Sequence, residues 1–432
     1  MSLVTPDKIR SLQRRLYVAA KEGPERRFHQ LYDKIYREDV LAHAYRLAKS
    51  NGGAAGVDGV SFKAIEAQGP DAWLARLGKD LREKTYRPDP VKRVLIPKPG
   101  GGQRPLGIPT VRDRVAQTAA KLVLEPIFEA DLEDSAYGYR PGRTAQQAVK
   151  AVHEAVCKGY RDVVDADLSK YFDTIPHDQL MRSVARRVVD REVLALVKSW
   201  LKAPVQVEDE NGKKRMEGGK GNNRGTPQGG VLSPLLANIY MNRFLRHWKQ
   251  QGRGEAFRAR IVNYADDFVI LSRGSAAKAL EWTRRVMTAL GLTINEKKTC
   301  LRNAREESFD FLGYTFGPEH YRKDGHWYLA AKPSHKSIRR LRERVRQELQ
   351  PGNKGTWPEA VKSLNRVLRG WAGYFSYGTR FLAYRALDRH VYDRVRHFLQ
   401  QRHKVPTRGT RLFSYERVYG ELGVYRLQAL LG

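Results

Sequence analysis

The sequence predicts an α+β fold in which an antiparallel sheet backed by helices is followed by a basic, helical C-terminal region. Two stretches predict β-hairpins. Residues 91–110 place a glycine-rich turn between two strand-like runs, and RIVNYADDFVILS places apolar runs on either side of Ala265-Asp266-Asp267. From Lys332 to the end the composition changes, with 22 Lys plus Arg against 7 Asp plus Glu. We therefore expect a domain boundary near that residue.

Length and charge restrict the class of protein. A chain of 432 residues is long enough for two or three domains, and its formal net charge of +32 predicts a polyanionic partner. The sequence has neither a run of about 18 apolar residues nor a signal-peptide pattern. We expect no membrane partner and a soluble, cytoplasmic protein. Cys157 and Cys300 lack the spacing of a disulfide or zinc module, so no structural metal site is expected.

The first 90 residues are expected to be mainly helical. Apolar residues recur at helical spacing to about residue 50, and helical character returns to about Glu83. Between these segments, the four glycines from Asn51 to Phe62 predict a loop. After the first hairpin, apolar spacing predicts helices over 113–130 and 145–157.

The middle of the chain is expected to alternate strands and helices. DVVDAD predicts a short strand ending at Asp167, and a helix follows it. The stretch from Asn211 to Arg224 predicts a polar loop, and a helix is expected from about Ser233. Further along, the pattern predicts a helix over 275–290 and one strand over 309–316.

The last 101 residues are expected to form a basic helical domain. In IRRLRERVRQEL one face of the expected helix is an apolar stripe, and arginines occupy the other faces. This pattern is typical of a surface helix that contacts phosphates. The stripe consists of Ile338, Leu341, Val345 and Leu349. Aromatic residues further on could stack on unpaired bases, but their helical spacing favours a role in the domain core; these are Trp371, Tyr374, Phe375 and Tyr377.

Adjacent carboxylates at a hairpin tip are the first candidate for chemistry. An isolated Asp-Asp pair is commonly a solvated turn. Here the apolar flanks press Asp266 and Asp267 against a core, where like charges repel and a bound cation resolves the conflict. If the strand that ends at Asp167 is their neighbour, three carboxylates meet at one place. Such an oxygen-rich set suits two Mg²⁺ ions about 3.5–4 Å apart, which is what nucleotidyl transfer to a 3′-hydroxyl needs.

Several sequence strings resemble a known family. VDADLSKYFDTIPHDQL, GTPQGGVLSPLLANIYMN and NYADDFVIL resemble, in order and spacing, successive motifs of reverse transcriptases. More narrowly, VDGVSF, IPKPGGGQRPLGIP and AYGYRPGR are similar to segments of the reverse transcriptase/maturase proteins encoded by group II introns. The resemblance runs from about residue 30 to about 425, and LRGWAGYFSYG is similar to the maturase domain, also called the thumb or X domain.

The resemblance implies a right-hand polymerase with fingers, a palm and a helical thumb/maturase domain. The expected division is an N-terminal extension and start of the fingers (1–90), fingers and palm (91–331), and the thumb/maturase domain (332–432). The chain ends at Gly432 without the segment typical of an endonuclease. It is therefore expected to be of the type lacking a C-terminal endonuclease domain, with a primer made elsewhere.

The resemblance also assigns catalytic and metal-binding residues. Asp167, Asp266 and Asp267 would be the catalytic acids and would bind two Mg²⁺ ions, for which Mn²⁺ could substitute. Leu168 would contribute its backbone carbonyl. Asp165 and Asp173 lie nearby in the sequence, and only the family pattern ranks Asp167 above them.

A second group of residues is expected to bind the incoming nucleotide. Phe172 would be the steric gate against a ribose 2′-hydroxyl, although core packing is the commoner role of a phenylalanine. Gln228 would line the pocket. Lys98 and Arg104 would hold the triphosphate, although single basic residues in so basic a chain are more often surface residues. Lys298 would protonate the leaving pyrophosphate, with its neighbour Lys297 as the alternative, or both could belong to a solvated charge run.

The implied function is RNA-directed DNA synthesis joined to binding of the parent intron RNA, which assists splicing and mobility. The expected partners are structured intron RNA, an RNA template with a DNA primer, and deoxynucleoside triphosphates; the sequence leaves the oligomeric state open. One alternative is an RNA-binding splicing cofactor whose polymerase activity is incidental. Another is a related polymerase recruited to phage defence, CRISPR adaptation or DNA repair.

Overall fold

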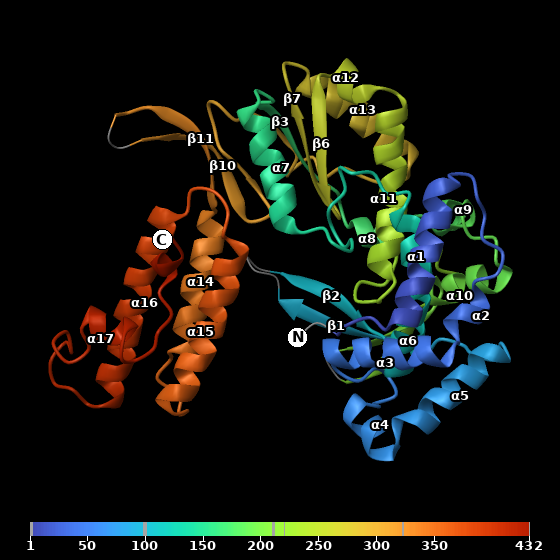
Figure 1. Ribbon diagram of the computed structural model, residues 1–432, viewed down its shortest axis with the longest axis horizontal. Helices are drawn as coiled ribbons and strands as arrows, with labels where there is room; N and C mark the ends of the chain where they lie inside the picture. Colours follow the sequence, from blue (N-terminus) through green and yellow to red (C-terminus); the bar gives the residue numbers. More distant parts are fainter. Residues whose placement is uncertain (1–2, 98–101, 210–211, 220, 322–323, 432) are drawn as a thin grey trace.

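Three β-sheets and the helices that cover them make up the computed structural model, which describes residues 3–97, 102–209, 212–219, 221–321 and 324–431 (Figure 1). The α+β class expected from the sequence is confirmed. None of the helices in these ranges combines the length and apolar character needed to cross a bilayer.

The N-terminal helices pack around one central helix. As predicted, the chain is helical on both sides of a loop over residues 52–61. The central helix α6 (Val111–Glu129) confirms the helix predicted over 113–130 and is buried along most of its length. The helices around it and beyond are α1 (Asp7–Glu22), α2 (Tyr32–Ile35), α3 (Glu38–Asn51), α4 (Phe62–Gln68) and α5 (Pro70–Arg82).

The predicted hairpin over 91–110 belongs to a four-stranded sheet with the order β2-β1-β4-β5. Its strands are β1 (Val91–Pro97), β2 (Gln103–Ile108), β4 (Pro204–Glu208) and β5 (Lys214–Gly218). The β1–β4 pair is parallel, and the other two pairs are antiparallel. The predicted polar loop over 211–224 is wrong in part, because β5 lies within it. Every residue of this edge strand is exposed, so its sequence carries no apolar alternation.

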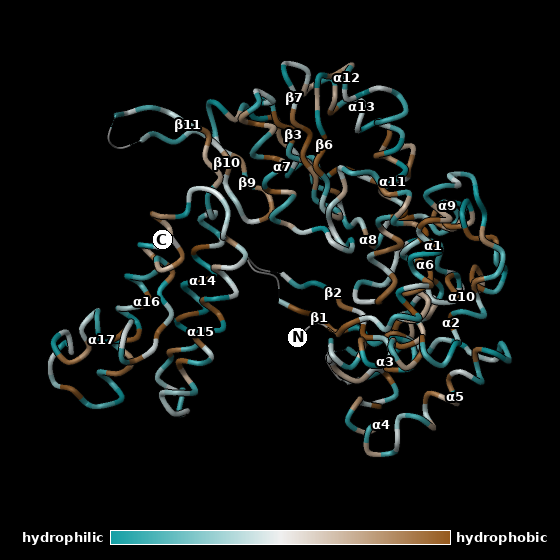
Figure 2. The backbone as a smooth tube through the Cα atoms, viewed as in Figure 1, coloured by the Kyte–Doolittle hydropathy of each residue, from teal (hydrophilic) through white to brown (hydrophobic). Residues whose placement is uncertain are grey.

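A second four-stranded sheet, which we call the palm sheet, has the order β6-β7-β3-β8 with all neighbours antiparallel. Its strands are β6 (Ala259–Tyr264), β7 (Asp267–Ser272), β3 (Asp162–Asp167) and β8 (Cys300–Asn303). Figure 2 shows that β3, β6 and β7 are strongly hydrophobic, as expected of strands buried on both faces. The predicted hairpin around Ala265 and the strand ending at Asp167 are both confirmed.

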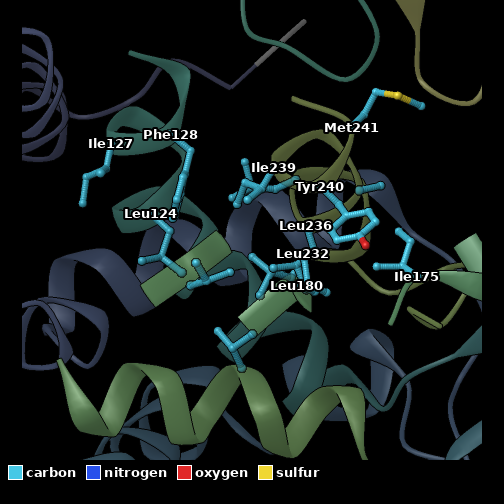
Figure 3. Packing of buried hydrophobic residues seen from close by; sticks show 14 of the residues in the cluster. Leu124, Ile127, Phe128, Ile175, Leu180, Leu232, Leu236, Ile239, Tyr240 and Met241 are labelled. Atoms are coloured by element: carbon cyan, nitrogen blue, oxygen red, sulfur yellow. The ribbon is translucent and has the colours of Figure 1, made fainter. Parts of the chain in front are cut away.

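Helices cover both faces of the palm sheet. Phe268 and Ile270 join the core shared with α11 (Ser233–Gln250) and α13 (Ala276–Ala289), whereas Val269 and Leu271 join the core shared with α7 (Ala145–Cys157). Figure 3 shows part of the first core, which α6 and α11 share with Leu180. The remaining helices of this region are α8 (Tyr171–Thr174), α9 (His177–Ala185), α10 (Arg191–Leu201) and α12 (Arg253–Ala256).

A three-stranded sheet with the order β11-β10-β9 joins the palm to the C-terminal helices. Its strands are β9 (Phe309–Phe311), β10 (Tyr314–His320) and β11 (Trp327–Pro333). The single strand predicted over 309–316 is wrong, because Leu312 and Gly313 both take positive φ values and form a turn. Phe309 consequently pairs with Phe316 across a hairpin. The apolar run FDFLGYTF conceals this turn, whose only signal is one glycine.

Three long helices form the C-terminal bundle: α14 (His335–Glu348), α15 (Trp357–Tyr374) and α16 (Phe381–Arg402). A short α17 (Tyr415–Tyr419) and a 3₁₀ helix, η1 (Leu427–Leu431), follow. The predicted stripe of α14 is confirmed, since Leu341, Val345 and Leu349 are buried and Ile338 packs partly buried against the same core.

The aromatic residues near the end of α15 pack in the interior rather than forming an open stacking surface. Phe375 is 5% exposed and lies 5.0 Å, between ring centroids, from Tyr314 of β10. Trp371 and Tyr374 join the same cluster, and the hydroxyl of Tyr377 contacts His153 Nδ1 at 2.8 Å. The prediction that these aromatic residues pack in a core is confirmed. Most of this core lies between the palm sheet and the C-terminal bundle rather than within the bundle.

Candidate active site

The strand register brings two of the predicted acids face to face. In the β3–β7 ladder, Asp167 is the direct partner of Asp267, and in the β6–β7 hairpin Tyr264 is the partner of Asp267. Ala265 and Asp266 form the turn between β6 and β7, and the buried side-chain amide of Asn263 donates to the Ala265 carbonyl oxygen at 2.9 Å. Segments about one hundred residues apart in the sequence therefore bring three carboxyl groups to one edge of the palm sheet.

Side-chain alternation puts the paired acids on one face of this sheet. Directly opposed residues of an antiparallel pair have Cβ atoms about 4.5–5.5 Å apart. Asp167 and Asp267 are such a pair, and Asp165, two residues earlier on β3, shares their face. Phe268 and Ala166 point to the opposite face, into the core under α11.

Burial and mutual repulsion disfavour the ionised form of these acids. Burial raises the pKa of Asp267 to about 7, and the negative charges of Asp165, Asp266 and Asp167 act in the same direction. Burial likewise raises the pKa of Asp165 to about 6 and raises the pKa of Asp266, which Asp167 also repels. Such a cluster favours a cation that would let all its members ionise together.

One cation already touches the cluster. The Lys298 ammonium lies 3.1 Å from Asp167 Oδ2, and the Asn295 side-chain amide donates to the same oxygen at 3.0 Å. The Asn295 backbone N–H also donates to the Asp167 carbonyl oxygen at 2.8 Å. Lys298 rather than Lys297 is therefore the lysine that the fold brings to the acids.

The backbone beside Asp167 offers a further oxygen. Leu168 forms an isolated antiparallel bridge with Ile294, and its side chain is buried. Among the described residues, none donates a hydrogen bond to the Leu168 carbonyl oxygen.

Phe172 packs under the more exposed ring of Tyr139. It is 7% exposed and makes an edge contact with Tyr139 at 6.4 Å between ring centroids. Tyr139 is 49% exposed, takes a positive φ of 54° and also contacts Tyr264 of β6. The side-chain amide of Asn238 on α11 donates to the Gly138 carbonyl oxygen at 2.7 Å. This hydrogen bond fixes the backbone immediately before Tyr139.

Arg104, Gln228 and Asp173 form a connected polar row. Arg104 Nε donates to Gln228 Oε1 at 3.0 Å, and Gln228 Nε2 donates to Asp173 Oδ2 at 3.1 Å. The positive charge of Arg104 acts on Asp266, whose pKa it lowers against the larger effect of burial. Lys98, the other expected triphosphate ligand, lies outside the described residues.

The turn that carries Gln228 is held against β2 by two glycines. The Gly107 N–H donates to the Gln228 carbonyl oxygen at 2.6 Å. Gly229 has a φ of +108°, and a Cβ atom there would lie 2.2 Å from the Gly107 carbonyl oxygen. Only glycine permits this approach, which orients Gln228 toward Arg104.

The residues fit a hard divalent cation in their chemistry. Carboxylates and a backbone carbonyl are the oxygen ligands that Mg²⁺ prefers. Within the described ranges, however, no three His, Cys, Asp or Glu side chains are grouped as a metal cluster. Asp167 instead directs one carboxylate oxygen at an ammonium and an amide group.

Two residues of this site had no role assigned from the sequence. Asn295 lies in GLTINEKKT, three residues before Lys298, and Tyr139 lies in AYGYRPGR. AYGYRPGR carries part of the family resemblance, and GLTINEKKT contains Lys298. Only the fold brings Asn295 to Asp167 and Tyr139 to Phe172.

Comparison with known proteins gives two family matches along the chain. The family described as "Reverse transcriptase (RNA-dependent DNA polymerase)" matches residues 96–316, and "Group II intron, maturase-specific domain" matches residues 338–415. The first match contains all three acids, and the second covers most of the C-terminal helices.

Individual relatives agree with these matches. Protein YkfC of Escherichia coli is 34% identical over 343 residues, which are 71% of this chain and 87% of that protein. An uncharacterized 91 kDa protein in the cob intron of Schizosaccharomyces pombe is 25% identical, over 80% of this chain and 50% of that protein. The group II intron-encoded protein LtrA of Lactococcus lactis subsp. cremoris is 34% identical, over 52% and 36%. The matched part is thus most of YkfC but half or less of the other two.

Proposed function

This chain belongs to the group II intron family of reverse transcriptases and maturases, and we propose on that basis that it synthesises DNA on an RNA template. The observation that carries the proposal is the pairing of Asp167 with Asp267 across β3 and β7, with Asp266 in the adjoining turn. In the same proposal, the chain divides into an N-terminal extension with the start of the fingers (1–90), fingers and palm (91–331), and a thumb/maturase domain (332–432).

Reverse transcriptases as a family use divalent metal ions, and we infer two Mg²⁺ ions here, with Mn²⁺ as a substitute. Asp167, Asp266 and Asp267, together with the Leu168 carbonyl oxygen, would hold them. When bound, the ions would activate the primer 3′-hydroxyl and neutralise charge on the triphosphate and the leaving pyrophosphate.

The residues around the acids would orient the nucleotide. Arg104 carries a planar guanidinium suited to triphosphate oxygens, and its contact with Gln228 supports a shared pocket. Lys98 would assist it. Phe172, fixed from outside by Tyr139, would exclude a ribose 2′-hydroxyl. Lys298 lies beside Asp167 and would give a proton to pyrophosphate as the bond to the leaving group breaks.

The maturase match supports a second role, the binding of parent intron RNA during splicing. The net charge of +32 supports a polyanionic partner of this kind. We propose that structured intron RNA, an RNA template with its DNA primer, and deoxynucleoside triphosphates are the partners.

The test is Asp266→Ala, assayed for primer extension on an RNA template and, separately, for assisted splicing of the parent intron. Loss of DNA synthesis with splicing retained is expected, because the acids serve only the first activity. The control is Asp71→Ala, which removes an exposed carboxylate on α5 and should keep both activities. Persistent DNA synthesis in Asp266→Ala would contradict the site assignment. A wild-type chain that assists splicing without making DNA would instead be a splicing cofactor.

A further inference from the structure

We propose that a basic groove behind the palm sheet, formed by α9, α11 and α13, binds the phosphate backbone of structured RNA at a place separate from the catalytic acids. The inference rests on the proposed function, which requires an RNA partner, and adds a specific contact surface for that partner.

The groove consists of two adjoining cavities. One, of about 570 Å³, lies between α9, α11 and α13, and the other, of about 590 Å³, lies beside α13 near α12. Val286 and Ala289 line both. At their junction the ring of His247, from the first cavity, stacks on Trp282, from the second, with centroids 5.5 Å apart and planes at 17°. The two cavities can therefore accept one extended ligand.

Positive charge dominates the lining. Its basic residues are Arg182, Arg186, Arg243 and Arg246 in the first cavity and Arg253, Lys278 and Arg285 in the second. Only two lining residues are acidic: Asp131, 3.4 Å from Arg186, and Glu281, 3.9 Å from Arg285.

Several of these cations have no acidic partner. Among the described residues, no carboxylate lies within ion-pair distance of Arg182, Arg246 or Lys278. The floor between α6 and α11 is apolar, because Phe128 and Ile239 line the first cavity. Because an apolar floor has a low dielectric constant, it strengthens the electrostatic field of the arginines in the groove. Guanidinium groups pair with phosphate oxygens in a planar, two-pronged geometry, so the lining fits a nucleic acid backbone.

The groove is separated from the acids by a helix layer and the palm sheet. Along α11, Arg243 and Arg246 lie on one face, and Phe244 and Trp248 lie on the opposite face. Phe244 contacts Phe268 of β7 at 5.6 Å between ring centroids. Since Phe268 and Asp267 point to opposite faces of the sheet, the acids lie on its far side. A template held at the acids therefore does not account for the basic groove.

The test compares two charge-matched double variants. Arg182→Gln/Arg246→Gln removes two groove cations, and Lys63→Gln/Arg76→Gln removes two exposed cations from α4 and α5. Binding of a labelled RNA hairpin with a blocked 3′ end is measured against salt concentration, and extension of a short primer on a short RNA template is measured in parallel. Arg182→Lys/Arg246→Lys, which keeps the charge, separates a folding defect from a charge effect.

The groove double variant should weaken hairpin binding and reduce the slope of log affinity against log salt by about 1.4–1.8, the value for two lost phosphate contacts. Extension of the short primer should stay at the wild-type rate, and the lysine variant should restore most of the slope. Equal slope changes in the two glutamine variants would overturn the proposal, as would equal competition by a DNA duplex of the same sequence. Failure of primer extension in the wild-type chain would count against the proposed function alone.

Discussion

Lys298 donates to Asp167, with its ammonium nitrogen 3.1 Å from Oδ2, whereas its neighbour Lys297 is exposed and makes no ion pair among the described residues. The fold thus gives different surroundings to two lysines that are adjacent in the sequence. Lys298 is 66% exposed, so this surface ion pair adds little to the free energy of unfolding. In the proposed function, its importance lies in the proton that it would deliver to pyrophosphate.

Lys298→Ala should lower the rate of nucleotide addition on the order of 10²-fold or more, because a positioned general acid contributes about that much. Lys297→Ala should leave the rate close to the wild-type value. Single-turnover extension with saturating deoxynucleoside triphosphate measures the step. A larger defect in Lys297→Ala than in Lys298→Ala would reverse the assignment.

Asp267→Asn should stabilise the chain in the presence of a chelator, and increasingly so as the pH rises from about 4 to about 7. Burial raises the pKa of Asp267 from 3.8 to about 7, so within this window the unfolded state loses a proton that the folded state keeps. The stability of the wild type therefore falls with rising pH, and Asn removes the effect. The gain levels off above about pH 7, at no more than about 4 kcal/mol.

Thermal unfolding across this pH range measures the difference. Asp71→Asn, at an exposed carboxylate, is the control and should show no such trend. Adding Mg²⁺ or Mn²⁺ should stabilise the wild type at pH 7 and narrow its gap to Asp267→Asn. No response of the wild type to either ion would argue against a metal site at these acids.

Phe172→Val should admit ribonucleotides, raising their incorporation relative to deoxynucleotides on the order of 10- to 100-fold, because a smaller side chain removes the clash with a 2′-hydroxyl. Tyr139→Ala should give part of this effect by freeing the Phe172 ring, and Tyr139→Phe, which keeps the edge contact, should not. The ratio of kcat/KM for the two sugars measures the outcome. Unchanged ratios in Phe172→Val would leave Phe172 as a core residue only.

Gly229→Ala should disrupt the turn that carries Gln228. Its φ of +108° and the 2.2 Å approach of a new Cβ atom to the Gly107 carbonyl oxygen together predict a loss of about 1–3 kcal/mol or more and weakened nucleotide binding. Gly221→Ala is the matched control, because a Cβ atom there would meet nothing within 4 Å. Gly229→Ala should change both the thermal unfolding temperature and the KM for nucleotide. Gly221→Ala should change neither.

Sequence reasoning succeeded where a local pattern is repeated or bounded by clear signals. The hairpin around Asp266, the strand ending at Asp167 and the helix over 145–157 all have strong periodicity or turn residues at their ends. It failed at β5, an exposed edge strand without alternation, and at Leu312 and Gly313, where a turn interrupts an apolar run.

For the candidate site, the sequence and its family resemblance indicated the acids and several neighbours, such as Lys298, Arg104 and Gln228, but not the contacts that join them. Asn295, Tyr139 and the row from Arg104 to Asp173 depend on contacts between segments far apart in the chain. No spacing rule within one segment reports such contacts. The groove behind the palm sheet is of the same kind, because its basic residues come from α9, α11, α12 and α13 and span about one hundred residues of the sequence.

The turn between Tyr264 and Asp267 has two residues, and side chains alternate between the two faces of each strand. The palm sheet therefore depends on the number of residues at this turn. Deleting or inserting a single residue in β7 beside the turn would rotate every following side chain to the other face of the sheet, sending Phe268 and Ile270 into the core under α7 and an aspartate into the apolar layer under α11. Natural length variation should therefore be absent from this short stretch while longer, exposed connections tolerate it. The number of residues between these two strands is therefore as strictly constrained as the identity of the residues themselves.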